Sequence, residues 1–126
     1  MAAKKILVVE DNALNMKLVR SLLIRGGYSV IEAGDAETGI ALAQEQHPDL
    51  ILMDIQLPGM DGLSATQHIR SEADLKDIPI VALTSYAMQE DVEKTLKAGC
   101  TGHISKPIDT RRFLDVISAY MSVNRT

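Results

Sequence analysis

Short apolar runs alternate with longer segments of helical periodicity along the chain. The apolar runs are typical of β-strands, and the segments between them place hydrophobic residues at the spacings of an amphipathic helix. Strands that alternate with helices favour parallel pairing through right-handed crossovers. We therefore predict five βα units, with strands near 5–10, 28–33, 49–54, 79–84 and 102–105 and helices near 14–25, 36–46, 61–71, 88–98 and 110–122.

Two of the predicted helices show a distinct apolar face. In the first, Leu14, Leu18 and Leu22 recur at every fourth residue, and the last helix carries the complete i, i+3, i+4, i+7 spacing of a buried face. That second face consists of Phe113, Val116, Ile117 and Tyr120. We expect both faces to pack on the sheet.

The third strand and the helix ends carry further signals. Residues 50–53 are continuously apolar, which is typical of a parallel strand covered on both faces, so we place this strand in the middle of the sheet. The glycine-containing pairs 26–27 and 98–99 are stop signals after the first and fourth helices. Asp35 and Asp109 are the expected N-caps of the helices that follow them.

Composition limits the class of protein. A chain of 126 residues with 46% hydrophobic residues suffices for one domain, so we expect 1–126 to form a single domain with no output domain. A net charge of -4 argues against direct nucleic-acid binding, which uses a concentrated basic face. No apolar run approaches the roughly 20 residues of a membrane-spanning helix, and no signal-type segment is present, so we expect a cytoplasmic protein without membrane insertion.

Cysteine and histidine supply no metal pattern. The single cysteine, Cys100, has no partner for an internal disulfide, and we expect it to be a small, partly buried residue. The histidines His47, His68 and His103 stand at unrelated spacings, which argues against a zinc site.

Polar residues follow four of the predicted strands at the point where each strand stops. They are Glu10 and Asp11, then Asp54, then Thr84, then Lys106. Since the carboxyl ends of parallel strands meet at one edge of a sheet, where ligands bind in open α/β folds, we expect these side chains to lie together. This set contains the groups that a phosphoryl-transfer site needs.

The chemistry of this set points to an oxygen-liganded divalent cation. The carboxylates of Glu10, Asp11 and Asp54, each with an unperturbed pKa of about 4, repel one another at neutral pH. Mg²⁺ or Mn²⁺, held by Glu10 and Asp11, would balance them, and Asp54 could then act as a nucleophile toward phosphorus. Thr84 and Lys106 would contact the other phosphoryl oxygens. A cis bond between Lys106 and Pro107 could aim the lysine inward.

These motifs together identify a family resemblance. The residues that carry it are Glu10-Asp11-Asn12, Asp54 within Leu-Met-Asp-Ile-Gln-Leu-Pro-Gly-Met-Asp-Gly at 52–62, Thr84-Ser85 and Lys106-Pro107. Across the whole chain the sequence resembles the CheY-like receiver domain of two-component response regulators. The resemblance implies a flavodoxin-like three-layer (βα)5 sandwich with a parallel sheet of strand order 2-1-3-4-5. The opening Asp-Asn-X-X-Asn-Met and residues 84–88 are most similar to single-domain cell-cycle regulators of the DivK type.

The resemblance also implies a function and a set of residue roles. Asp54 would accept a phosphoryl group from a phosphohistidine on a sensor histidine kinase or a histidine phosphotransfer protein, and the domain would catalyse only its own phosphorylation and dephosphorylation. The Gln56 backbone carbonyl would complete the metal site with Asp11 and Asp54, and Glu10 would act through water. Gln56 and Tyr86 would control the approach of water, and the bulk of Tyr86 is expected to slow dephosphorylation.

Signal output is expected through protein contact. The resemblance implies a target-binding surface on the fourth helix, fifth strand and fifth helix, with Thr84 and His103 as switch residues. The family commonly has Tyr or Phe where this chain has His103, and an imidazole changes charge near physiological pH. We therefore expect partner affinity to depend on pH between pH 6 and 8.

Three other interpretations compete with this one. A phosphatase with an aspartate nucleophile typically needs a second acid two residues further on, where Gln56 stands. A flavin carrier needs a phosphate cradle rich in glycine or hydroxyl groups after the first strand, where this chain is acidic. A degenerate receiver would bind partners constitutively, but the intact Asp54, Thr84 and Lys106 argue against it.

We expect Asp61 and Gly62 to start the third helix rather than to bind metal.

Overall fold

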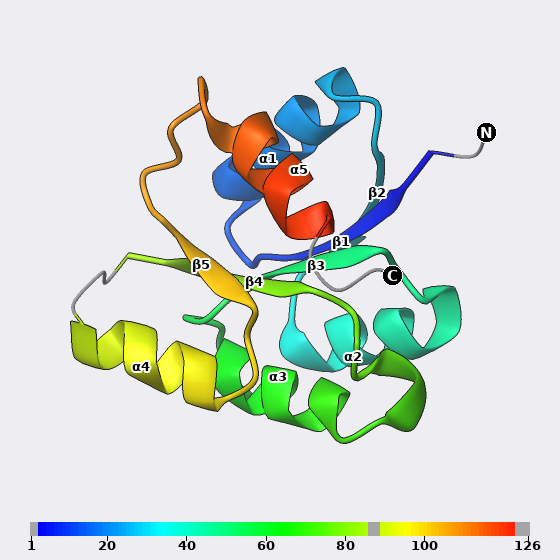
Figure 1. Ribbon diagram of the computed structural model, residues 1–126, viewed down its shortest axis with the longest axis vertical. Helices are drawn as coiled ribbons and strands as arrows, with labels where there is room; N and C mark the ends of the chain where they lie inside the picture. The colour runs from blue at the N-terminus through cyan, green and yellow to red at the C-terminus, as the bar shows by residue number, and fades with distance from the viewer. Residues whose placement is uncertain (1–2, 86–88, 123–126) are drawn as a thin grey trace.

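The computed structural model describes residues 3–85 and 89–122, which form alternating strands and helices (Figure 1). The strands are β1 (Lys5–Val9), β2 (Ser29–Ala33), β3 (Leu50–Asp54), β4 (Ile80–Thr84) and β5 (Gly102–Ser105). The helices are α1 (Ala13–Arg25), α2 (Ala36–Gln46), α3 (Gly62–Arg70), α4 (Gln89–Lys97) and α5 (Phe113–Met121), with a short 3-10 helix, η1, at Ala73–Leu75. The predicted order of elements is confirmed.

All strands pair in parallel in the order β2-β1-β3-β4-β5, which confirms the flavodoxin-like topology. Helices α1 and α5 cover one face of the sheet, and α2, α3 and α4 cover the other (Figure 1). Strand β3 lies in the centre, and every one of its residues is buried. A hydrophobic core lies on each face of the sheet, and alternate residues of β3 point into one or the other. Leu50 and Leu52 pack toward α1 and α5, whereas Ile51 and Met53 pack toward α2 and α3.

The apolar face predicted for α1 is wrong in part. Leu22 is buried, but Leu14 is 78% exposed and Leu18 is 38% exposed. A helix turns once in about 3.6 residues, so a row of every fourth residue drifts by about 40° per step and cannot stay against a flat sheet. The buried residues of α1 are Met16, Val19, Leu22 and Leu23, which mix spacings of three and four.

Helix α5 begins at Phe113, later than predicted, and Asp109 is not its N-cap. The Asp109 carboxylate instead accepts a hydrogen bond from the backbone N–H of Arg111 at 3.0 Å, closing a side-chain turn before the helix. Phe113 and Ile117 are buried as expected, while Val116 and Tyr120 are only half-buried.

The other helix boundaries follow their predicted signals. Asp35 caps α2 by accepting from Thr38 N–H at 2.7 Å, and Asp61 caps α3 by accepting from Ser64 N–H at 2.8 Å. Gly27, with φ of 89°, follows α1, and a glycine also follows α4. Over the described residues, none of the helices has the length and apolar character needed to cross a membrane.

Candidate functional site

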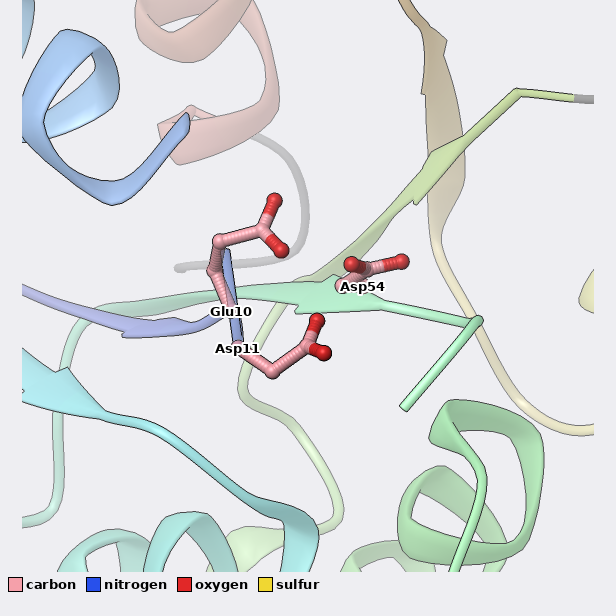
Figure 2. A group of neighbouring side chains, drawn as sticks. All are labelled: Glu10, Asp11 and Asp54. Atoms are coloured by element: carbon pink, nitrogen blue, oxygen red, sulfur yellow. The ribbon is translucent and has the colours of Figure 1, made fainter. Parts of the chain in front are cut away.

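Three carboxylates converge at the carboxyl edge of the sheet (Figure 2). Glu10 and Asp11 follow β1 directly, and Asp54 ends the neighbouring strand β3. Each offers a carboxylate oxygen within 4.8 Å of the others. Glu10 and Asp54 are buried, whereas Asp11 is exposed. The sequence prediction that these residues lie together is therefore confirmed.

Lys106, just after β5, brings a positive charge to this cluster. Its ammonium Nζ lies 3.1 Å from Glu10 Oε1 and donates a hydrogen bond to Asp54 Oδ2, also at 3.1 Å. The backbone N–H of Lys106 donates to Thr84 O at 2.7 Å, and the Lys106–Pro107 bond is cis. Burial lowers the pKa of Lys106, but the bonds to Glu10 and Asp54 outweigh it and hold this pKa above its usual range.

Glu10 is the electrostatically unfavourable member of the cluster. Burial, reinforced by contact with Asp54, raises its pKa to about 7, although bonds from Asn12 and Lys106 act in the opposite direction. Its Oε2 accepts from the Asn12 N–H at 3.2 Å. Its buried Oε1 accepts no well-directed hydrogen bond from the described residues, despite the nearby ammonium of Lys106.

The donor atoms fit a hard divalent cation. Carboxylate oxygens from three residues converge, one of them exposed on Asp11 and one buried on Glu10, where it forms an ion pair with Lys106 but accepts no well-directed hydrogen bond from the described residues. Mg²⁺ and Mn²⁺ prefer oxygen ligands of this kind. A cation here would offset the repulsion that one lysine balances only in part.

Asp54 is held at both carboxylate oxygens. Oδ2 accepts from Lys106, and Oδ1 accepts from the backbone N–H of Gln56 at 2.9 Å. The Gln56 backbone carbonyl was predicted to bind the metal together with Asp54. The hydrogen bond from the Gln56 N–H therefore fixes the position of this backbone relative to the Asp54 carboxylate. The predicted aspartate nucleophile is 2% exposed, so little of its surface is open to solvent.

The remaining predicted residues lie on β4 and β5. Thr84 ends β4, is buried, and pairs with Ser105 across the sheet. His103 is half-buried on β5, beside Ala82. Tyr86 lies outside the described residues, so its predicted effect on dephosphorylation stays a prediction.

A cavity of about 350 Å³ opens between β5 and α5. It is lined by His103, Ile104, Ser105, Pro107, Ile108, Asp109, Arg112, Phe113 and Val116. This cavity lies on the surface that was predicted to bind targets. Its β5 side is formed by His103 and by the residues on either side of Lys106.

Sequence reasoning missed the double role of Asn12. Its side chain caps α1 by accepting from the N–H groups of Leu14 at 2.9 Å and Asn15 at 3.0 Å, while its own N–H donates to Glu10. Helix α1 therefore begins beside the acids, where its positive end favours negative charge. An asparagine directly before a helical segment is a recognisable capping signal, so this role could have been predicted.

A family model for the response regulator receiver domain matches residues 6–118. The chain belongs to the response regulator receiver domain family. It is 45% identical over 118 residues to the polar-differentiation response regulator DivK of Brucella ovis, a match that covers 94% of this chain and 96% of the relative. A similar regulator from Brucella anthropi is 44% identical over the same length.

Solved receiver structures agree with this assignment. The receiver domain of the sensor histidine kinase PA1611 of Pseudomonas aeruginosa, with magnesium coordinated in its active-site cleft, is 36% identical with a TM-score of 0.88, covering 95% of this chain and 98% of that one. The chemotaxis regulator CheY4 of Vibrio cholerae is 28% identical with a TM-score of 0.90, covering 94% and 99%. The receiver domain described here is therefore a response regulator of two-component signalling.

Proposed function

We propose that this receiver accepts a phosphoryl group on Asp54 from a phosphohistidine of a sensor kinase or a histidine phosphotransfer protein. The observation that carries the proposal is the position of the Asp54 carboxylate, buried at the end of β3 between two further acids and the Lys106 ammonium. The proposed role is that of a signalling domain in the cytoplasm, without turnover of a separate substrate. Control of cell-cycle events, which the resemblance to DivK-type regulators implies, is part of the proposal; the Brucella relatives are named as polar-differentiation response regulators.

The proposed reaction is a single phosphoryl transfer. A carboxylate oxygen of Asp54 forms a bond to phosphorus, the P–N bond of the donor breaks, and its electron pair stays on the donor imidazole. Lys106 contacts a phosphoryl oxygen, and the Thr84 hydroxyl donates to another. Asp11, Asp54 and the Gln56 carbonyl, with Glu10 acting through water, would hold Mg²⁺, which would supply the positive charge that the phosphoryl oxygens require.

The exposed leucines of α1 favour direct contact with a protein donor. Leu14 and Leu18 stand one turn apart on the helix that begins beside Asp11, so a protein that approaches Asp54 from this side could bury both side chains. We expect Leu14→Ser to slow phosphotransfer from a protein donor and to leave phosphorylation by acetyl phosphate unchanged. Equal slowing with both donors would contradict this assignment.

Output is proposed to pass through α4, β5 and α5. The phosphorylated state would favour one arrangement of Thr84 and His103, and a target would bind that arrangement better than the resting one. The cavity between β5 and α5 lies on this surface and gives a target side chain a place to enter. The pH dependence expected from His103 stays a prediction, checked by comparing target affinity at pH 6 and pH 8.

Intact-mass measurement after incubation with acetyl phosphate tests the proposal. We expect the wild type to gain one phosphoryl group, about 80 Da, only with Mg²⁺, and Asp54→Asn to gain none. Asp74→Asn removes an exposed acid of η1 and should label like wild type. Absence of label on the wild type would favour a receiver that binds partners constitutively.

A further inference from the structure

The start of α3 rests directly on the backbone of the proposed phosphoacceptor. Gly62 is the first residue of this helix. A Cβ placed there would lie 2.6 Å from Ile55 Cα and 2.9 Å from the carbonyl carbon of Asp54, and it would collide with the Asp54 carbonyl oxygen. All of these neighbours are backbone atoms, which cannot rotate out of the way as a side chain can. Only glycine therefore fits between this helix and this strand end.

Two hydrogen bonds hold Gly62 in that position. Its N–H donates to Ile55 O at 3.3 Å, and its carbonyl accepts from the buried Thr66 hydroxyl at 2.8 Å. On its other side Ile55 donates its N–H to Leu83 O at 3.2 Å, in continuation of the β3–β4 pairing. The peptide that follows Asp54 is thus clamped between β4 and the first turn of α3.

The clamped peptide controls both the carboxylate and the neighbouring backbone. The Asp54 carboxylate bonds the Gln56 N–H, so a displacement at Ile55 moves the nucleophile and the proposed metal-binding carbonyl together. We propose that Gly62 is a positioning residue: by lacking a Cβ, it lets α3 fix the Asp54–Gln56 backbone in the geometry for cation binding and phosphoryl transfer. This inference rests on the proposed function of Asp54.

Gly62→Ala tests the inference directly, with Gly26→Ala as its matched control. A Cβ at Gly26 would also meet an atom at close range, 2.7 Å, but that atom is the flexible end of the Leu114 side chain, and Gly26 lies at the end of α1 that is far from the site. We expect Gly62→Ala to weaken Mg²⁺ binding at least about tenfold, because small displacements at a site cause large losses. Gly26→Ala should bind Mg²⁺ like wild type.

Amide hydrogen exchange at Gln56 gives a readout that requires neither metal nor phosphate. If Gly62 positions this backbone, the Gln56 N–H should exchange faster in Gly62→Ala than in wild type. The two proteins are compared under conditions in which their free energies of unfolding are equal. Wild-type exchange together with wild-type Mg²⁺ affinity would overturn the inference. A wild type that fails to take label from acetyl phosphate would refute the proposed function, while the exchange comparison would still decide the role of Gly62.

Thr66 variants decide the question if Gly62→Ala does not fold. Thr66→Val keeps the side-chain volume but removes the bond to Gly62 O, whereas Thr66→Ser keeps the bond and leaves a small cavity. We expect Thr66→Val to bind Mg²⁺ several-fold more weakly with faster Gln56 exchange, and Thr66→Ser to retain wild-type values despite lower stability. Mg²⁺ affinity that follows stability instead, falling in Thr66→Ser and not in Thr66→Val, would overturn the inference.

Discussion

Lys106 and Arg70 are partly buried cations at opposite edges of the sheet, and their partners differ in kind. Lys106 lies at the carboxyl edge and contacts two carboxylates, each at 3.1 Å. Arg70, in the last turn of α3, lies near the opposite edge, among the loops that lead into β4 and β5. The hydrogen bonds of Lys106 go to a charged side chain, whereas those of Arg70 go to neutral oxygens, most of them on the backbone.

Arg70 joins three segments through well-placed neutral acceptors. Its Nε donates to Gly99 O at 2.8 Å, Nη1 to Leu75 O at 3.3 Å and Lys76 O at 2.9 Å, and Nη2 contacts Thr101 Oγ1 at 3.4 Å. Burial lowers its pKa, but arginine remains charged. A cation whose partners are fixed carbonyls stabilises one structure, whereas a lysine among titratable carboxylates can exchange partners during a reaction.

Removing the lysine should give the largest effect. We expect Lys106→Met to slow labelling by acetyl phosphate by about 10²-fold, because a positioned donor to the transferred group is lost. Intact-mass kinetics measure this loss, and Lys97→Met, which removes an exposed lysine of α4, is the control. A labelling rate close to wild type would mean that the two cations do not differ in function.

Removing the arginine should affect stability instead. We expect Arg70→Met to lower the free energy of unfolding by about 2–3 kcal/mol, since charge-assisted hydrogen bonds to several carbonyls are lost. Labelling per folded molecule should stay at the wild-type rate. Urea unfolding and intact-mass kinetics measure the two quantities, with exposed Arg25→Met as control. Slower labelling in the folded Arg70 variant would break the comparison.

The charged edge should also be the pH-sensitive one. The raised pKa of Glu10, about 7, means that its folded state holds a proton that the unfolded chain releases near pH 4.5. The stability that the folded protein gains from binding this proton is fully present below pH 4.5 and is lost as pH rises through about 7. In EDTA, the melting temperature of Glu10→Gln should therefore rise relative to wild type between pH 5 and pH 8. A constant difference would contradict the assigned pKa.

A smaller effect should show that reagents have poor access to the edge of the sheet near Arg70. Cys100 is buried next to the residues that Arg70 holds, and burial raises its pKa although Thr66 and Arg70 act against this. At pH 8 its thiolate fraction is therefore below that of a free thiol, so iodoacetamide should modify it at least about tenfold more slowly in folded protein than in urea. Equal rates, measured by mass spectrometry, would show that this edge is open.

The sequence predicted the sheet and the main site residues for identifiable physical reasons. Continuous apolar runs such as 50–53 can be buried on both faces only in a covered parallel sheet. Polar residues at the ends of such runs must then meet at one edge, as Asp54 and Lys106 do. The strand order came from the family resemblance, because periodicity alone does not say which strands are neighbours.

Other features depend on tertiary packing that a linear pattern does not contain. Leu14 and Leu18 satisfy a periodicity rule, but their exposure is decided by which side of α1 meets the sheet. Asp109 has a side chain that can cap a helix, yet its carboxylate accepts a hydrogen bond from the Arg111 N–H in a turn that precedes α5. The fit of Gly62 against Asp54 depends on how closely a helix and a strand approach one another, which composition does not encode.

The hydrogen bond between Lys106 and Asp54 joins residues 52 positions apart in the sequence. No fragment that ends before β5 contains both partners, and closing such a long loop is an entropically costly, late event in folding. A chain emerging from the ribosome would therefore complete the cluster of Asp54 and Lys106 only when the last strand has been synthesised and paired. The phosphorylation proposed for Asp54 would therefore be slow in any nascent chain that has not yet formed β5.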